Sequence, residues 1–430
     1  MRSNGLGPLS VVLLLGVAFP SQAADMSDEL SADSFTLGAS QCQFFNASLV
    51  AERAGGDVSV NSRDNECVHA SPLQVALNYQ ADDTNEFFVV LGFATGNGLE
   101  ARAPWILSPF AADLEDDVKD INGRGRDYLL VMAYKHTFTL RDGSTVGASA
   151  GILDSTWYLD GNAYANDWSP QFINEVFVNS ASHGLPSYDA GAALEYRKGA
   201  WSISAVGMNI GENDAGNNFN FWGAQFGYHP QTTFGPGNYR VIAVGTSSAF
   251  PDPMLAATHR RSAWGLSFDQ AFGEVVGGFL RFAWQSDDAA VAHQALYSGG
   301  LNFSGSGWGR ICDNIGVGGA YLPGGNLDVE NTYVAEAYYR AGLGRHLSVS
   351  LDVQYMKDDP CVRILARPIP PAGLPGCALP PRFETEGWLA DVQWTGARTR
   401  AISRAVHESG SIRGCSGEPS ALARATRLGQ

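Results

Sequence analysis

Hydrophobic and polar residues alternate along most of the chain after about Pro72, and this alternation is the strongest structural signal in the sequence. Successive residues of a strand point to opposite faces, so the pattern predicts many half-buried strands. Asp142-Gly143 between two alternating segments marks a tight hairpin turn. The expected strands lie near residues 73–79, 128–140, 145–153, 192–196, 201–205, 219–228, 239–247, 263–272, 275–284, 295–303, 315–321, 332–341 and 347–356.

The number of expected strands narrows the architecture. A strand of about ten residues with its turn or loop takes about 25 residues, so the chain holds roughly 16 strands. A propeller and a closed membrane barrel both accept that many antiparallel strands without exposed edges, but a propeller repeats every 40 to 45 residues or so, and no such repeat is visible. The sequence therefore predicts an all-β protein, a transmembrane antiparallel β-barrel. Its 50 glycines, 22 phenylalanines and low charged fraction of 17% agree with that prediction.

The N-terminus predicts export. Arg2 precedes an apolar run from Leu9 to Phe19, and Ser21-Gln22-Ala23 forms a small-residue cleavage site, so residues 1–23 are interpreted as a signal peptide. The apolar run is shorter than the roughly 20 residues of a spanning helix. Six cysteines suit an oxidising compartment.

The pairing of the cysteines stays open at this stage. Cys42 and Cys67 could close one loop within an N-terminal segment at residues 24–71, and Cys361 and Cys377 could close another. Cys312 and Cys415 have no assigned partner.

Charge and motifs exclude several classes of function. The formal net charge of −16 argues against nucleic acid as a partner, because a basic patch would be expected. The eight histidines form no metal-binding pattern, so no metal or other cofactor is expected. Ser182-His183 raises the alternative of an outer-membrane phospholipase, but adjacent strand residues point to opposite faces and no GxSxG motif is present. No enzyme activity is predicted.

Seven segments in order resemble the carbohydrate-selective outer-membrane porins of the OprB family. They are NGRGRDYLL (122–130), YLDGNAYANDWSPQFINEVFVNS (158–180), GENDAGNNFNFWGAQFGY (211–228), PGNYRV (236–241), LSFDQAFGEVVGGFLRFAWQ (266–285), ALYSGGLNFSGSGWGRICDNIG (295–316) and VAEAYYRAGLGRHLSVSLDVQYMKDD (334–359). The resemblance implies a porin-type barrel in a Gram-negative outer membrane that passes glucose-like monosaccharides by diffusion. It also implies contact with outer-membrane lipid and with the machinery that assembles such barrels. Assembly with further copies of the chain is left open, and a general, organic-acid or cation porin remains the alternative.

Several polar residues are candidates for lining the pore. Segment 104–126 could fold toward the lumen, with carboxylates facing arginines, or it could be a solvated surface loop. Arginine is the better candidate for binding sugar, because its planar donor fork suits pairs of hydroxyl groups. The candidates in this segment are the acids Asp113, Glu115, Asp116 and Asp117 and the cations Arg124 and Arg126.

The remaining candidates lie in three other places. Strand alternation ends near Leu153, so residues 158–177 are predicted to form a loop or rim at the barrel mouth. The polar residues of this loop either contact sugar or have a purely structural role. Arg240 and Arg281 lie within apolar alternation and should point inward, since a lipid-facing cation in mid-strand costs roughly 2–4 kcal/mol. A motif at 308–313 predicts either a lumenal ion pair with a stacking ring or an interface tryptophan with a wall-stabilising salt bridge. These further candidates are Tyr158, Asp160, Asn166 and Asp167, and Trp308, Arg310 and Asp313.

The C-terminal end departs from the family. Residues 387–394 read GWLADVQW, like the start of a last strand, but residues 396–430 contain six arginines, two glutamates and no aromatic residue. The predicted barrel therefore spans residues 72–395 and is followed by an atypical basic tail. Closure needs the last strand to pair with the first, because lipid cannot satisfy an open edge. If residues 388–394 cannot pair fully, poor assembly is predicted.

Overall fold

The computed structural model describes residues 31–37, 41–53, 56–62, 66–68, 71–97, 105–107, 115–167, 171–343, 347–360 and 382–398. Two elements form a small hairpin outside the main sheet, β13 (Phe250–Pro251) and β14 (Thr258–His259). Short helical turns are η1 (Ile121–Gly123), η2 (Ser155–Trp157), α1 (Glu175–Val178), η3 (Ala181–His183) and η4 (Gly305–Trp308). Among the described residues, no helix has the length and apolar character needed to cross a bilayer.

The main sheet contains 19 strands. They are β1 (Ser31–Leu37), β2 (Gln41–Arg53), β3 (Gly56–Ser62), β4 (Glu66–Val68), β5 (Ser71–Gln80), β6 (Asn85–Thr95), β7 (Leu129–Thr139), β8 (Thr145–Leu153), β9 (Asp189–Lys198), β10 (Trp201–Ile210), β11 (Phe219–Tyr228), β12 (Gly237–Thr246), β15 (Ser262–Phe272), β16 (Val276–Gln285), β17 (Ala295–Ser304), β18 (Asn314–Pro323), β19 (Val329–Gly342), β20 (Leu347–Pro360) and β21 (Arg382–Arg398).

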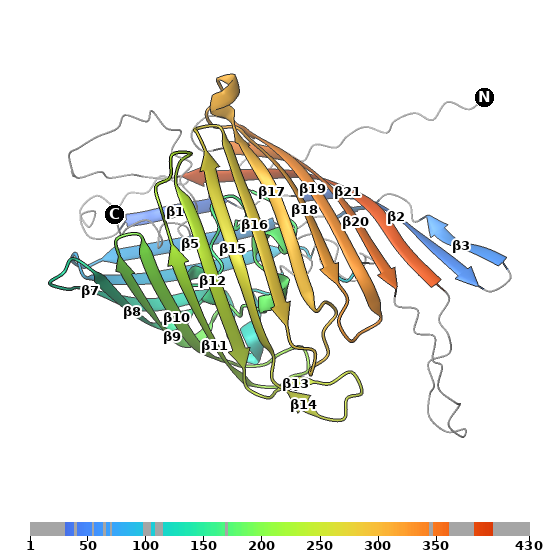
Figure 1. Cartoon of the computed structure of the whole chain (residues 1–430), viewed down its shortest axis with the longest axis horizontal. Helices are drawn as coiled ribbons and strands as arrows, with labels where there is room; N and C mark the ends of the chain where they lie inside the picture. The colour runs from blue at the N-terminus through green and yellow to red at the C-terminus, as the bar shows by residue number, and fades with distance from the viewer. Residues whose placement is uncertain are drawn as a thin grey trace.

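Antiparallel pairing joins these strands into a closed ring. Each strand from β5 to β12 and from β15 to β21 pairs with the next one in the chain. β1 closes the ring, because it pairs with β5 on one side and with β21 on the other. β2 continues along β21, and both β3 and β4 pair with β2, so β1–β2 and β3–β5 act as two interrupted strands of a 16-stranded barrel. Figure 1 shows the strands side by side around an enclosed space. The predicted fold class is confirmed.

The barrel begins earlier and ends later in the sequence than expected, and one of its strands, β6, was missed. β1 to β4 lie within segment 24–71, which the alternation pattern had left outside the barrel. β6 was missed because its sequence, NEFFVVLGFAT, is apolar at successive positions and therefore does not alternate. β21 has 17 residues, runs to Arg398 and pairs along its length with β20 and β2. Residues 388–393 are therefore paired on both sides, and how well the chain assembles stays a prediction. Residues 399–430 lie outside the described part of the chain.

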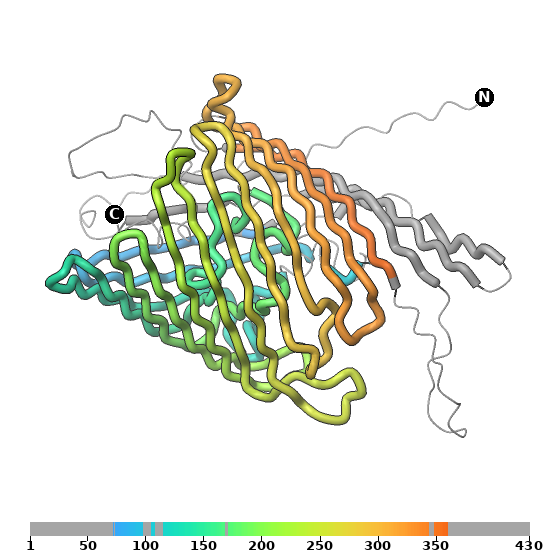
Figure 2. Tube along the Cα trace, viewed as in Figure 1, coloured from blue at the N-terminus to red at the C-terminus, as the bar shows by residue number. Residues whose placement is uncertain are grey.

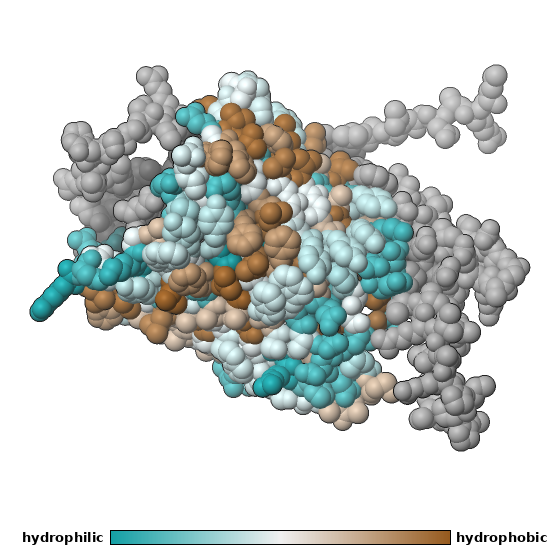
Figure 3. Space-filling view, in the orientation of Figure 1, coloured by the Kyte–Doolittle hydropathy of each residue, from teal (hydrophilic) through white to brown (hydrophobic). Residues whose placement is uncertain are grey.

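Apolar side chains cover the outside of the barrel, whereas the inward face carries polar side chains together with buried apolar ones such as Phe221 and Ile242. In β11, Trp222 and Phe226 point outward and are 51% and 46% exposed, whereas Gln225 between them points inward and is 9% exposed. The same alternation places Leu280 outside and Arg281 inside on β16. This arrangement reverses that of a soluble protein and is the one that a lipid solvent requires. In Figure 3, apolar (brown) and near-neutral residues cover much of the visible wall, and many of the polar (teal) ones lie toward the strand ends.

Aromatic rings gather near both ends of the strands on the outer surface. Trp264 and Trp284 stack with their ring centroids 4.4 Å apart near one end. Near the other end, Trp201 and Tyr228 stack at 4.2 Å. Aromatic girdles at both water–lipid boundaries are characteristic of transmembrane barrels.

The connections divide the barrel into two ends. At the turn end, neighbouring strands are joined by short connections such as 140–144, 199–200 and 273–275. At the loop end lie the long connections 96–128, 154–188 and 247–261. Figure 2 shows part of the long connection between β8 and β9, coloured green, behind the strands of the near wall.

We expect Leu280→Arg to prevent stable insertion, because it would put a cation into lipid near the middle of β16. The cost should be about 2–4 kcal/mol at the bilayer midplane. Val276→Arg is the matched control: Val276 starts the same strand at the turn end, where the cost falls to about 0–1 kcal/mol. Urea unfolding in lipid vesicles, followed by the heat-modifiable mobility of the barrel on gels, measures both. Equal stability of the two variants would contradict the assigned outer face.

Candidate functional site

The connection between β8 and β9, residues 154–188, is here called the inner loop. Its residues contact β15, β16, β19 and β20, and β19 and β20 lie about half-way round the ring from β8 and β9. A loop can reach the inward-facing residues of those strands only by crossing the interior. The inner loop therefore narrows the lumen from within. The sequence had predicted a loop or rim at the mouth for residues 158–177, so the loop was foreseen and its inward path was not.

Arg281 of β16 is the main anchor of the inner loop. Its Nε donates to Asp160 Oδ1 at 3.0 Å, and its Nη atoms donate to the carbonyl oxygens of Phe177 and Ala165, each at 2.6 Å. Further donations reach the carbonyls of Asp160 and Val178. Arg281 is only 1% exposed. One side chain therefore satisfies backbone oxygens from both halves of the loop.

Asp160 completes this anchor from the side of the loop. Its Oδ2 accepts from the backbone N–H of Ser180 at 2.6 Å and lies 3.6 Å from His183 Nδ1. Burial alone would raise the pKa of Asp160, but the charge of Arg281, the nearby His183 and the hydrogen bond from Ser180 N outweigh it and hold this pKa below its ordinary value. Asp160 is therefore ionised in the folded protein. Because its carboxylate binds residue 180, it also ties the two ends of the loop together.

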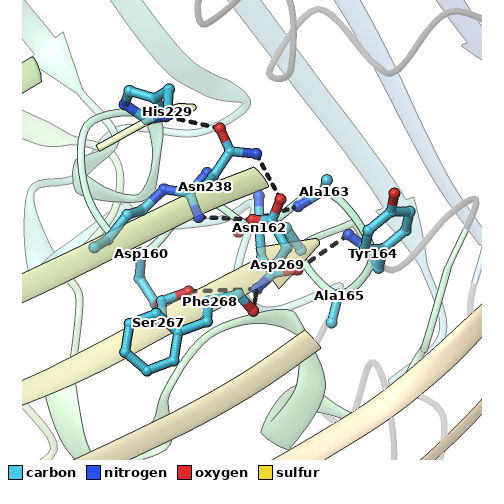
Figure 4. A network of polar contacts seen from close by, with 12 residues as sticks. Asp160, Asn162, Ala163, Tyr164, Ala165, His229, Asn238, Ser267, Phe268 and Asp269 are labelled. Carbon is cyan, nitrogen blue, oxygen red and sulfur yellow. Dashed lines mark hydrogen bonds and ion pairs between the residues drawn. The ribbon is translucent and has the colours of Figure 1, made fainter. Parts of the chain in front are cut away.

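A second polar cluster holds the first part of the inner loop against β12 and β15. Asp269 accepts from Arg240 Nη1 at 2.7 Å and from the backbone N–H of Ala163 at 3.2 Å. Asn238 donates to the other oxygen of Asp269 and contacts His229 Nδ1. In Figure 4, residues 162–165 of the loop lie beside Asp269, with Asn238 and His229 on the other side of that carboxylate.

The second part of the inner loop is held by β19 and β20. Glu336 accepts from the backbone N–H groups of Ile173 and Asn174 at 2.6 and 3.0 Å. The Asn174 side chain caps α1 by accepting from Val176 N, and it donates to Gln354 Oε1 at 2.8 Å. Glu336 and Gln354 are 2% and 0% exposed. These contacts fix the start of α1 on β19 and β20, on the side of the barrel opposite β8 and β9.

An apolar cluster inside the barrel completes the contact between the inner loop and the wall. Phe172 packs against Phe177, Phe279 and Tyr338 with centroid distances of 4.9, 5.5 and 5.1 Å. Trp105 and Leu107, from the connection between β6 and β7, belong to the same cluster. A second buried apolar cluster contains Tyr158 and Leu159 of the inner loop with the inward-facing Phe221 and Ile242. Both parts of the inner loop therefore pack on apolar side chains inside the barrel.

The structure places the predicted residues of segment 104–126 in two settings. Trp105 and Leu107 are buried inside the barrel, whereas Glu115 forms an ion pair with Lys119 and Asp116 accepts from Asn97. Asp117 is exposed, and Asp113 lies outside the described residues. Glu115 and Asp116 thus bind Lys119 and Asn97, and the predicted arrangement of carboxylates facing arginines across the lumen stays a prediction. Contact of Glu115, Asp116 or Asp117 with a solute stays a prediction.

Arg124 and Arg126 bind the edge of the barrel wall. Arg124 Nε donates to Asp189 Oδ2 at 3.2 Å, and its Nη2 donates to the side-chain and backbone oxygens of Asn209. Arg126 donates to the carbonyl oxygen of Tyr188. These contacts hold residues 121–126 against the start of β9 and the end of β10. A role in binding sugar stays a prediction for both.

Within the inner loop, the predicted residues differ in their access to water. Tyr158 and Asp160 are 9% and 0% exposed, whereas Asn166 and Asp167 are half-buried. The backbone N–H groups of Asn166 and Asp167 donate to the side chain of Gln171. Arg240 and Arg281 point inward, as predicted, and each forms an ion pair with a carboxylate. Of these residues, Asn166 and Asp167 are the ones that a solute in the lumen could touch.

Trp308, Arg310 and Asp313 lie at the turn end, in the connection between β17 and β18. Asp313 accepts from Arg310 Nε at 2.5 Å, from Tyr339 Oη at 2.5 Å and from Gly342 N at 3.0 Å. Burial would raise the pKa of Asp313, but these hydrogen bonds outweigh it and lower the pKa to about 2. Trp308 is 40% exposed. The arrangement corresponds to the alternative of a wall-stabilising salt bridge.

Sequence reasoning missed several inward-facing polar residues. Glu336 and Gln354 were not singled out, although both alternate with apolar neighbours on their strands, which is the signal that identified Arg240 and Arg281. Lys135 and Glu195 were also missed; they form an ion pair at 2.5 Å, and their side chains are 15% and 11% exposed. Cys312 is disulfide-bonded, and the other five cysteines lie outside the side chains that the structure describes.

His293 predicts a pH dependence of stability. It contacts Thr332 Oγ1 at 2.8 Å, and burial lowers the pKa of His293 from 6.5 to about 4. The unfolded chain binds a proton near pH 6.5 and the folded chain does not, so stability is complete above that pH. It should fall by roughly 2–3 kcal/mol as the pH drops from about 6.5 to about 4.

The unfolding midpoint in urea, measured between pH 4 and pH 7, tests this dependence. His293→Gln keeps a donor for Thr332 but does not titrate, so its pH profile should be flatter than that of the unmodified chain. His259→Gln is the control, because His259 is 41% exposed and should leave the profile unchanged. A steep profile in His293→Gln would assign the dependence to other groups.

The comparisons with known proteins agree with the barrel. No family model matches the chain. An uncharacterized protein of Aquifex aeolicus is 32% identical over 279 residues, which are 64% of this chain and 75% of the relative. The high-pH structure of Pseudomonas putida OprB superposes with a TM-score of 0.58 at 16% identity, over 84% of this chain and 94% of OprB. Its low-pH structure gives a TM-score of 0.46 at 12% identity, over 84% of this chain and 93% of OprB. The chain therefore has the fold of an outer-membrane porin and belongs to the same family as the uncharacterized Aquifex aeolicus protein.

Proposed function

We propose that the chain is an outer-membrane channel for passive diffusion of small neutral polar solutes, with sugars of the size of glucose as the substrate class. The observation that carries the proposal is the inner loop, which is held across the lumen and narrows it. Such a passage selects solutes by their size and by the hydrogen bonds they form, without any covalent reaction. The apolar outer wall and its aromatic girdles support a location in a bilayer.

The pairing of the inward cations supports a neutral solute. Arg240, Arg281 and Lys135 each form an ion pair with a carboxylate at 3.0 Å or less. A paired cation contributes little field to the lumen, so these residues supply hydrogen-bond donors without strong attraction for anions. Carbohydrate selectivity also follows from the resemblance of the chain to the OprB family and rests on that resemblance.

Liposome swelling tests the proposal. Purified barrel in vesicles should admit glucose faster than an anion or a cation of equal size, and a trisaccharide should enter much more slowly than glucose. Reversal potentials in a KCl gradient should stay close to zero. Faster entry of organic cations or acids than of glucose would instead identify a charge-selective porin, the alternative that the net charge of −16 keeps open.

A further inference from the structure

Two connections that are far apart in the sequence meet inside the barrel. Trp105 and Leu107 are each 6% exposed and belong to the cluster that contains Phe172, Val176 and Phe177 of the inner loop. Ile106 between them is 49% exposed. Trp105 and Leu107 therefore face the apolar cluster, whereas Ile106 faces water. Residues 105–107 are here called the strap.

The backbone of the strap is held by the barrel wall. Ile106 N donates to Asp358 Oδ2 at 2.9 Å, and the hydroxyl group of Thr332 donates to Asp358 Oδ1. His293 Nε2 lies 2.8 Å from Thr332 Oγ1 and must be the donor there, because the only Thr332 hydroxyl proton is directed at Asp358. Asp358, Thr332 and His293 are 7%, 1% and 6% exposed. A buried series of hydrogen bonds, from Ile106 through Asp358 and Thr332 to His293, therefore fixes the strap on β19 and β20.

We propose that the strap positions the inner loop, so that two connections together, rather than the inner loop alone, set the size limit for solutes. This inference rests on the proposed channel function. Asp358 and Thr332 are positioning residues: they act on the inner loop through the strap and touch no solute.

The physical reason is the exposed apolar surface that the inner loop would otherwise present. Phe172 and Phe177 are buried inside the barrel, and they stay in place only while apolar atoms cover them. Trp105 and Leu107 supply part of that cover, and the wall residues Leu322, Val334 and Met356 supply another part. Removing the indole ring leaves a cavity beside the inner loop, which costs packing energy and favours movement of the loop.

Trp105→Ala is the principal test, with Ile106→Ala as the matched control on the same segment. Ile106→Ala keeps the backbone N–H that binds Asp358 and removes only a side chain that faces water. In liposome swelling, Trp105→Ala should raise the entry rate of a trisaccharide relative to glucose several-fold, and Ile106→Ala should not. Thr332→Val, which removes one hydroxyl group, should shift the ratio in the same direction by a smaller amount.

A second measurement does not depend on transport. Val176 of the inner loop is 0% exposed, so a Val176→Cys variant should react slowly with a water-soluble maleimide. Adding Trp105→Ala should accelerate labelling several-fold, whereas adding Ile106→Ala should leave the rate unchanged. An unchanged rate with Trp105→Ala overturns the inference even if the barrel conducts. If the unmodified chain admits no solute while Trp105→Ala still accelerates labelling, the channel function fails and the positioning role of the strap stands.

Discussion

Replacing Arg281 by methionine is expected to release the inner loop and to increase single-channel conductance several-fold. The guanidinium group makes five hydrogen bonds to the loop, and no other described residue reaches the carbonyl groups of Ala165 and Phe177. Methionine fills a similar volume but leaves the Asp160 carboxylate buried without its cation. Breaking a buried pair on one side typically costs about 3–5 kcal/mol. Movement of the loop into solvent relieves that cost, because water then satisfies Asp160.

Planar-bilayer recordings measure this effect, and the unfolding midpoint reports the cost in stability. Arg310→Met is the matched control: it also breaks an arginine–aspartate pair, but Arg310 is 51% exposed and lies at the turn end, so conductance should not change. Adding Asp160→Asn to Arg281→Met removes the unpaired charge and should recover part of the lost stability. A conductance equal to that of the unmodified channel in Arg281→Met would show that other contacts hold the loop.

The barrel could be predicted from the sequence because its signal is repeated. Every strand that faces lipid on one side and water on the other must alternate, so segments such as 219–228 and 263–272 were found almost to the residue. The exceptions have a physical reason. β6 packs apolar residues on both faces, since Phe88 points inward and contacts Trp157 of the inner loop, and its alternation is lost.

The candidate site could be predicted only in part. The inward direction of Arg240 and Arg281 follows from the cost of a cation in lipid, which depends on local sequence alone. Their partners are Asp269 on the neighbouring strand β15 and Asp160 on the inner loop. These pairs depend on strand register and on the path of the loop, and alternation carries no information about either. Glu336 binds a loop more than 160 residues away in the chain. Such contacts between residues far apart in the sequence depend on the closed barrel, so they are seen only in the three-dimensional structure.

The turn chemistry of Asp160 makes removal of the inner loop a practical experiment. Asp160 has a left-handed backbone conformation with φ 56°, and its carboxylate accepts from Ser180 N at 2.6 Å. The two ends of the segment 161–179 therefore lie side by side. Replacing this segment by a Gly-Ser-Gly bridge should preserve the barrel and should give the largest increase in conductance of any variant considered, because the whole obstruction leaves the lumen. Neutral sugars of different sizes should then enter vesicles at similar rates.

The control for this excision is a shortened hairpin at the same end of the barrel. Removing residues 253–256 between β13 and β14 deletes Met254 and Leu255, which are 84% and 81% exposed and lie in none of the contacts that hold the inner loop. Conductance should remain that of the unmodified channel. The excised barrel also isolates the strap: with no inner loop left to position, Trp105→Ala should cause no further change. Size discrimination that survives excision of residues 161–179 would place the narrowest point of the channel in the barrel wall itself, and both the inner loop and the strap would lose their assigned roles.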